Sequence, residues 1–271
     1  MKRDESMSEY QFLNSYTFAN GATVKNRIVM PPMTEKSAFE NGVVSNDEIE
    51  YYRKRAGGVG IQITGCANVS DLGKGFEGEL SVTKDRDIPQ LSRLATAMKS
   101  QGAKAILQIF DAGRMTNTAV LRGEQPVSAS AVKAARSNSE TPRKLSEHEV
   151  EKIIKDFGSA TKRAIQAGFD GVEIHGANTY LIQQFFSPDS NRRRDQWGGS
   201  LEQRMNFPVA VVEEVRRVVA KYASAPFIVG YRISPEEIEN PGIRLDDTMR
   251  LIPRLIDTGI DYLHISLNKV W

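Results

Sequence analysis

The sequence predicts an α/β fold of the (β/α)8 TIM-barrel type, with about six of the eight β/α units present. Short apolar runs alternate with segments of helical period, a pattern typical of a parallel sheet wrapped by helices. Most of these runs are continuously apolar rather than alternating, as expected of strands that are covered on both faces. Polar side chains follow several runs directly, which favours a barrel whose strand ends meet at one mouth.

The predicted elements alternate along the chain. The six predicted strands are Arg27–Met30, Gly60–Thr64, Ala105–Phe110, Gly171–His175, Phe227–Ile233 and Tyr262–Leu267. The predicted helices are Asp47–Ala56, Ile88–Gln101, Glu147–Ala167, Leu201–Tyr222 and Asp246–Thr258. The third helix has the clearest boundaries, because Ser146 and Glu149 form a capping-box pattern at its start and Gly168 follows its end.

Two arrangements accommodate this repeat, an open doubly wound sheet and a closed barrel. An open nucleotide-binding sheet has a GxGxxG turn after its first strand, and the segment Pro31–Ser37, PPMTEKS, does not resemble one. In a barrel, functional groups come from the C-terminal ends of several strands. The chain places such residues at or after the first five predicted strands: Met33, Thr34, Gly65, Gln108, His175 and Arg232. We therefore predict the barrel.

Charge and cysteine content exclude several classes of protein. The 36 basic and 34 acidic residues leave a net charge of +2, so we expect no nucleic-acid partner. The single cysteine, Cys66, forms no intramolecular disulfide and belongs to no cluster of thiols, so no metal site is predicted. No apolar run approaches the roughly 18 residues of a membrane span, and the N-terminus has no signal-peptide core. We therefore expect a cytoplasmic protein without a membrane partner.

Three charged or titratable features are interpreted from their neighbours in the sequence. The run Arg192–Arg194 is interpreted as a solvated loop whose charge is balanced by Asp189 and Asp195. His264 lies within an apolar strand and is interpreted as a core residue. Arg232 also lies within an apolar strand, where an unpaired charge is costly, and this favours a functional role for it.

The segment Gly171–Gly199, GVEIHGANTYLIQQFFSPDSNRRRDQWGG, carries the strongest indication of chemistry. Its apolar run ends abruptly in His175, Asn178 and Tyr180, three side chains that can handle a proton or a carbonyl oxygen. Because they directly follow a strand end, we predict that they form part of an active site.

The chain resembles the old yellow enzyme family of FMN-dependent ene-reductases, also described as NADH:flavin oxidoreductases. The resemblance runs from about residue 18 to residue 267. It rests on four stretches in this order: NRIVMPPMT at Asn26–Thr34, LQIFDAGR at Leu107–Arg114, the block Glu173–Arg204, and the arginine of VGYRIS, Arg232. Such a combination, in this order and at these intervals, is hard to obtain by chance.

The resemblance implies that FMN lies across the barrel mouth. It implies that Pro32, Met33 and Thr34 border the flavin, with the Thr34 hydroxyl near its C4 carbonyl and N5. Gly65 resembles the small residue that lets the backbone approach the ring, Gln108 the glutamine that contacts the pyrimidine edge, and Arg232 the arginine whose charge stabilises reduced FMN.

The resemblance also implies the reaction. NADH or NADPH reduces FMN and leaves, and an α,β-unsaturated carbonyl or related nitro compound is then reduced at its C=C bond. His175 and Asn178 resemble the pair of donors to the activating oxygen, and Tyr180 resembles the acid that delivers a proton to the α-carbon. The expected partner is thus a small molecule.

Two departures from the family qualify these expectations. The family's barrel has eight strands, so we expect residues 1–271 to form a single FMN-binding domain that lacks the last two β/α units, which would hold the FMN phosphate. The chain is then either part of a longer protein or a truncated, non-catalytic barrel that binds a partner, and exposed edge strands favour self-association into a homo-oligomer. Lys36 stands where some subfamilies have an aromatic residue.

Overall fold

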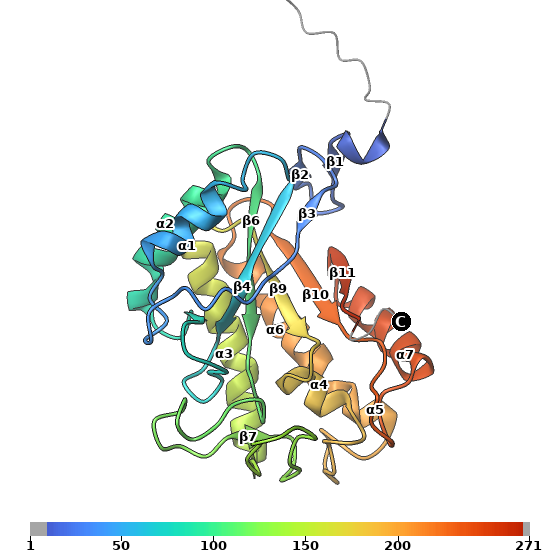
Figure 1. Ribbon diagram of the computed structural model, residues 1–271. Helices are drawn as coiled ribbons and strands as arrows, with labels where there is room; N and C mark the ends of the chain where they lie inside the picture. Colours follow the sequence, from blue (N-terminus) through green and yellow to red (C-terminus); the bar gives the residue numbers. More distant parts are fainter. Residues whose placement is uncertain (1–9, 268–271) are drawn as a thin grey trace, which may run out of the picture.

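The computed structural model describes residues 10–267 (Figure 1). Its strands are β1 (Tyr16–Thr17), β2 (Thr23–Val24), β3 (Val29–Met30), β4 (Ile61–Asn68), β5 (Leu80–Ser81), β6 (Lys104–Phe110), β7 (Val127–Ser128), β8 (Arg143–Lys144), β9 (Gly171–Gly176), β10 (Ile228–Ile233) and β11 (Tyr262–Ile265). Its helices are η1 (Gln11–Leu13), α1 (Asn46–Arg53), η2 (Asp85–Asp87), α2 (Ile88–Lys99), α3 (Glu147–Gln166), α4 (Leu181–Phe186), α5 (Leu201–Arg204), α6 (Asn206–Tyr222) and α7 (Leu245–Asp257).

The central sheet is parallel, and its strands are paired in chain order. The hydrogen-bonded path runs β3-β4-β6-β9-β10-β11, with β5 as an additional partner of β4. A doubly wound sheet would reverse direction at a switch point, whereas this order advances one strand at a time. The six strands therefore form part of a (β/α) barrel, which confirms the predicted fold class, and each of the six predicted strands is present.

Helices cover the outer face of the curved sheet (Figure 1). Helix α1 contacts α2, and α3 contacts α6. Helix α3 begins as predicted, since the Ser146 hydroxyl accepts a hydrogen bond from the Glu149 backbone N–H at 3.3 Å and the Glu149 carboxylate accepts one from the Ser146 N–H at 2.8 Å. Its apolar stripe, which includes Val150 and Phe157, is buried against the sheet and α6. Within residues 10–267, no helix has the length and apolar character needed to cross a membrane.

The structure corrects two helix assignments. The predicted helix Leu201–Tyr222 is divided into α5 and α6 at Met205. Pro208 has no N–H to donate to the Arg204 carbonyl four residues earlier, so the helical hydrogen-bond ladder is interrupted there. Helix α4 was not predicted, because all six of its residues are buried and it has no polar face to give it a helical period.

The interpretation of Arg192–Arg194 as a solvated loop is wrong for its central residue. Arg193 is only 2% exposed. Its guanidinium donates to the carbonyls of Ala129 at 3.1 Å and Leu145 at 2.5 Å, and it forms an ion pair with Asp195 at 2.8 Å. Arg193 therefore connects its own loop by hydrogen bonds to the two segments that contain Ala129 and Leu145.

Replacing Arg193 with alanine is expected to destabilise the protein by about 3 kcal/mol, because it leaves two buried carbonyls without their donor and removes the ion-pair partner of Asp195. Urea unfolding measures this loss. The matched control is Arg194→Ala at the exposed neighbouring position, which is expected to change stability by less than about 0.5 kcal/mol. Equal effects of the two substitutions would contradict a structural role for Arg193.

The two outer strands of the sheet leave an apolar groove between them. Among residues 10–267, β3 and β11 each have a strand neighbour on one side only. The groove has a volume of about 370 Å³ and is lined by Phe18, Val29, Pro31, Ile61, Ile63, Tyr262, Leu263, His264 and Ile265. Val29 and Ile265 are 44% and 56% exposed at its edges. Self-association through these edges stays a prediction.

One buried carboxylate makes stability depend on pH. Glu48 on α1 is 3% exposed, and its Oε2 atom has no hydrogen-bond partner among residues 10–267. Burial, with a smaller effect of the nearby Glu35 carboxylate, raises the pKa of Glu48 to about 8. Between the ordinary pKa of 4.5 and 8, the folded protein therefore holds a proton that the unfolded chain has lost.

We expect the free energy of unfolding to fall, by on the order of a few kcal/mol, as pH rises from about 5 to 8. Glu48→Gln removes the ionisable group and should flatten this part of the profile, measured as Tm against pH. The control is Glu50→Gln at a half-exposed position of the same helix, where the carboxylate pairs with Arg53 and burial plays no comparable part. An unchanged slope in the Glu48→Gln variant would contradict the assignment.

Candidate active site

His175 is positioned by the C-terminal end of β9. It is 3% exposed, and its Nδ1 atom accepts a hydrogen bond from the Ala177 backbone N–H at 3.3 Å. Burial and the nearby Arg232 guanidinium hold the pKa of His175 well below its usual value, so the ring is neutral. Because Nδ1 is an acceptor, the ring hydrogen lies on Nε2, and His175 presents an Nε2–H donor.

A left-handed turn follows the strand. Asn178 and Thr179 have φ values of 56° and 66°, which are uncommon for residues other than glycine and strained for the β-branched Thr179. The Thr179 N–H donates to Gln183 Oε1 at 2.9 Å, and the Thr179 carbonyl accepts from Gln184 Nε2 at 2.7 Å. These two glutamines of α4, which sequence reasoning passed over, hold the turn that presents the next residue to the mouth.

Tyr180 directly follows this turn and packs on His175. The two ring centroids are 5.0 Å apart at an interplanar angle of 80°, and the Phe110 ring packs on Tyr180 at 4.9 Å and 74°. Burial raises the pKa of the Tyr180 phenol well above its usual value, so it carries its proton at neutral pH. The structure thus places a protonated phenol beside the imidazole donor.

Ser266 links Asn178 to Arg232. The Asn178 amide donates to the Ser266 hydroxyl oxygen at 3.1 Å, and Arg232 Nη2 donates to the same oxygen at 3.1 Å. Ser234, after β10, accepts from the Asn178 backbone N–H at 3.1 Å. The sequence signal for both serines is weak, since Ser234 directly follows a predicted strand and Ser266 lies near the end of another.

Arg232 is half-buried and lies in register between His175 and His264. Its Nε atom is buried and has no hydrogen-bond partner among residues 10–267. Burial lowers the pKa of its guanidinium, although a guanidinium stays charged at neutral pH. A positive charge with an unused buried N–H at a barrel mouth is suited to a ligand that offers an acceptor.

Gln108, near the end of β6, is directed at a carboxylate. It is 2% exposed, and its Nε2 atom donates to Glu173 Oε1 at 2.7 Å. No residue among 10–267 donates to Gln108 Oε1, which leaves an acceptor available. Sequence reasoning missed Glu173, although it stands two residues before His175 and so lies on the same face of the strand.

The residues after β3 form the edge of the mouth. Pro32 is buried, whereas Met33 is 55% exposed and Thr34 is exposed. Gly65 packs against them, since a Cβ atom at position 65 would lie 2.8 Å from the Met33 carbonyl oxygen. The nearby cavity is narrow and is lined by both segments. The predicted contacts of these four residues with a cofactor stay predictions.

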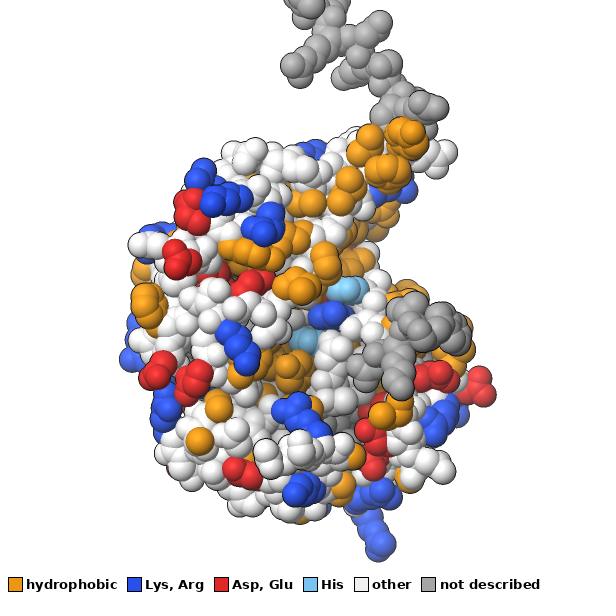
Figure 2. Space-filling model, viewed as in Figure 1, with side chains coloured by type: hydrophobic (Ala, Val, Ile, Leu, Met, Phe, Trp, Pro, Cys, Tyr) orange, Lys and Arg blue, Asp and Glu red, His pale blue; other side chains and the backbone are white. Residues whose placement is uncertain are grey.

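Cys66 lies directly beside this cluster, since Tyr180 packs against the small apolar group of Cys66, Phe110 and Ala112. Cys66 is buried against Phe110 and Ala112, and burial raises the pKa of its thiol well above the usual value. This environment agrees with the packing role that is usual for a lone buried cysteine. Histidine side chains come to the surface between hydrophobic side chains near the middle of the face in Figure 2.

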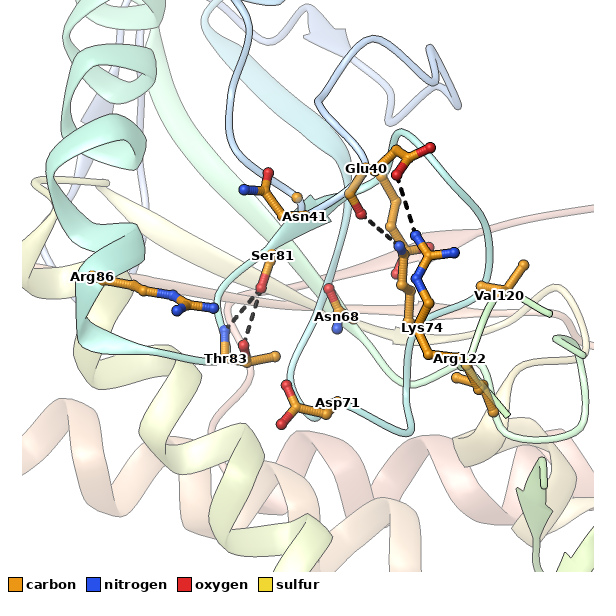
Figure 3. A pocket seen from close by; sticks show the side chains of 13 residues that line it. Glu40, Asn41, Asn68, Asp71, Lys74, Ser81, Thr83, Arg86, Val120 and Arg122 are labelled. Carbon is orange, nitrogen blue, oxygen red and sulfur yellow. Dashed lines mark hydrogen bonds and ion pairs between the residues drawn. The ribbon is translucent and has the colours of Figure 1, made fainter. Parts of the chain in front are cut away.

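A larger cavity of about 420 Å³ lies beside β5 and the loop around Arg122 (Figure 3). Its cations are partly paired already, since Lys74 contacts Glu77 at 2.5 Å and Arg122 contacts Glu40 at 3.4 Å and Glu77 at 2.9 Å. His175, Asn178 and Tyr180 do not line this cavity. The cluster at the strand ends, and not this cavity, is therefore the candidate active site.

Comparison with known proteins identifies the family. The model of the NADH:flavin oxidoreductase / NADH oxidase family matches residues 16–270, and the chain belongs to this family. Among solved structures, the old yellow enzyme homologue from Zymomonas mobilis is 27% identical with a TM-score of 0.87, covering 97% of this chain and 75% of that one. Morphinone reductase in complex with tetrahydroNAD is 29% identical with a TM-score of 0.85, covering 94% and 73%. The resemblance read from the sequence is confirmed.

Curated relatives are more similar in sequence but differ in length. The NADH:acrylate oxidoreductase of Vibrio harveyi is 52% identical over 96% of this chain, and the match covers 26% of that protein. The NADH:fumarate oxidoreductase of Klebsiella pneumoniae is 49% identical over 96% of this chain and 28% of its own length. The probable NADH-dependent flavin oxidoreductase YqiG of Bacillus subtilis is 47% identical, and 68% of its length is covered. The chain thus spans about a quarter of the first two relatives.

The family implies a flavin, and the mouth fits a flavin ring. The buried Arg232 Nε–H has no acceptor among residues 10–267, and Gln108 Oε1 has no donor there. A flat heteroaromatic ring whose edge alternates acceptors and donors would satisfy both atoms. The donor set therefore agrees with the cofactor that the family name implies.

We expect His175 to remain neutral, with its hydrogen on Nε2, from about pH 5 to pH 8. Nitrogen NMR of the imidazole rings measures both the charge and the tautomer, and His175→Gln assigns the signal. A titration midpoint near the ordinary value of about 6.5, or a hydrogen on Nδ1, would contradict the hydrogen-bond geometry.

Proposed function

We propose that this chain forms an FMN-binding domain of an NAD(P)H-dependent oxidoreductase that reduces C=C bonds activated by a neighbouring carbonyl or nitro group. One observation carries the proposal: a neutral imidazole with an Nε2–H donor packs at 5.0 Å on a protonated phenol, beside an arginine with an unused N–H. Family membership supports the flavin and the pyridine nucleotide in general terms.

Arg232, Gln108 and the segment Pro32–Thr34 would hold the cofactor. The Arg232 charge favours a ring that becomes negative on reduction, and the Gln108 amide offers an acceptor to the pyrimidine edge. Gly65 allows β4 to pack closely beneath Met33. When bound, FMN supplies two-electron chemistry, accepting hydride from NADH or NADPH and passing it to the alkene.

His175 and Asn178 would bind the activating oxygen of the substrate. Negative charge develops on this oxygen as the β-carbon is reduced, and two donors set in advance stabilise it. The His175 tautomer is fixed by the Ala177 N–H, and Asn178 is held by Ser234 and Ser266. Neither donor has to reorganise during the reaction.

Tyr180 would deliver the proton to the α-carbon. A phenol whose pKa is raised by burial is a weak acid in the ground state, but it can protonate a carbanion-like centre that is far more basic. Its T-shaped contacts with His175 and Phe110 fix the ring plane. The imidazole would therefore bind the oxygen while the phenol protonates carbon.

The similarity to the Vibrio harveyi and Klebsiella pneumoniae relatives suggests a second group of substrates. Those two proteins are named for acrylate and fumarate, whose double bonds are next to a carboxylate. Lys36 is an exposed cation over the Phe76 ring at 5.7 Å, at the same edge as Thr34. We therefore include alkenes that carry a carboxylate among the candidate substrates.

We expect the purified protein to bind FMN, to lose the visible flavin absorbance on addition of NADH or NADPH, and to recover it with cyclohexenone or acrylate. Tyr180→Phe should slow recovery on the order of a hundredfold while leaving reduction by NADH nearly unchanged. The double variant His175→Ala, Asn178→Ala should weaken binding of phenols and enones and slow turnover a hundredfold or more, with flavin content retained.

The control is His148→Ala, at an exposed position of α3 on the outer surface, which should leave both half-reactions unchanged. A colourless protein that cannot be reconstituted with FMN would contradict the proposal for this chain. It would favour the non-catalytic, partner-binding alternative. Loss of flavin from the double variant would show that this pair contacts the cofactor instead of the substrate.

A further inference from the structure

A fully buried carboxylate lies beneath the proposed site without a part in it. Glu173 on β9 is 0% exposed. Its side chain accepts hydrogen bonds from Gln108 Nε2 at 2.7 Å and from the Tyr262 hydroxyl at 3.0 Å, and it contacts His264 Nδ1 at 2.9 Å. Three groups that can donate thus converge from β6 and β11 on one acceptor, an arrangement that suits an ionised carboxylate.

The strand register explains why these groups meet. Gln108, Glu173, Gly230 and Tyr262 occupy one row across β6, β9, β10 and β11. A Cβ atom at Gly230 would collide with the Tyr262 ring, so only glycine lets this ring lie across β10 and reach Glu173. The next row toward the mouth contains His175, Arg232 and His264.

We propose that Glu173 is a positioning residue for the flavin ring: it fixes the orientation of the Gln108 amide and supplies the negative charge that balances Arg232. This inference rests on the proposed function. It assigns a part to Glu173, Tyr262, His264 and Gly230, which otherwise have none.

The orientation of the Gln108 amide follows from hydrogen-bond chemistry. A carboxylate accepts and cannot donate, so the amide must turn its NH2 group to Glu173 and its Oε1 atom away. This leaves Oε1 and the second Nε2 hydrogen, a matched acceptor and donor pair, for a ring edge. With Glu173→Gln, the partner can both donate and accept, and the Gln108 amide is free to flip.

The charge balance follows from burial. Arg232 is half-buried, its Nε has no hydrogen-bond partner among residues 10–267, and its Nη2 donates a hydrogen bond to the neutral Ser266 hydroxyl. Glu173 lies one row below Arg232 on the neighbouring strand, and its charge counteracts the effect of burial on the pKa of the Arg232 guanidinium. Without this negative charge, the positive charge of Arg232 is no longer balanced. The site then stabilises the reduced, negatively charged flavin ring relative to the oxidised, neutral ring.

The test compares Glu173→Gln, which keeps the shape and removes the charge, with Glu173→Asp, which keeps the charge and withdraws it from Gln108. The matched control is Glu214→Gln, another buried carboxylate, which pairs with Lys155 and Arg217 on the outer helices. For each variant, we would measure Kd for FMN, Kd for lumiflavin, which has the ring and no phosphate, and the reduction potential of the bound flavin.

Glu173→Gln is expected to bind oxidised FMN and lumiflavin about tenfold more weakly. It should also raise the potential by about 30 mV, corresponding to a tenfold change in the relative affinity for the reduced form of a two-electron couple. Glu173→Asp should weaken ring binding but leave the potential close to that of the wild type. Glu214→Gln should lower only Tm.

The outcomes separate this inference from the proposed function. A folded Glu173→Gln variant with unchanged affinities and potential would overturn the positioning role and leave the proposed function intact. If Glu173→Gln does not fold, the Glu173→Asp variant takes its place. An affinity of Glu173→Asp for lumiflavin equal to that of the wild type would then overturn the positioning role. A wild-type protein that binds neither FMN nor lumiflavin would overturn the proposed function, and the inference with it.

Discussion

Six parallel strands are hydrogen-bonded in chain order, and this pairing places their C-terminal ends at one edge of the sheet. Residues separated by more than 200 positions in the chain, such as Thr34 and Ser266, are brought to the same end of the barrel by this order alone. The register between neighbouring strands then determines which side chains are in contact. His175 meets Arg232 because they are register partners, and Gln108 meets Glu173 for the same reason.

The barrel interior changes from apolar to polar over three rows. The lowest row contains Ile106 and Ile228, the middle one Gln108 and Glu173, and the upper one His175 and Arg232. Burying polar groups in this way is costly unless their hydrogen bonds are satisfied. The Glu173 carboxylate has three partners, whereas the Arg232 Nε–H has none among residues 10–267. The Arg232 Nε–H thus lies in the row nearest the mouth, where a ligand can supply its acceptor.

The turn after β9 shows how backbone strain is retained at the site. A threonine with positive φ is unfavourable on its own, and here both its N–H and its carbonyl are held by glutamines of α4. Helix α4 is completely buried, so these amides have fixed surroundings. The position of Tyr180 is therefore determined by the packing of a six-residue helix whose own sequence shows no helical period.

Local apolar runs, strand-end residues and short motifs in the sequence were sufficient to predict the strands, the barrel, the family and the segment that carries His175, Asn178 and Tyr180. The three-dimensional arrangement was needed to show that Arg193 is buried, that Gln108 faces Glu173 and that the Tyr262 ring crosses Gly230. The reason is physical: burial and partner choice for a polar side chain depend on the register between strands that are distant in the chain, and no local pattern of residues encodes that register.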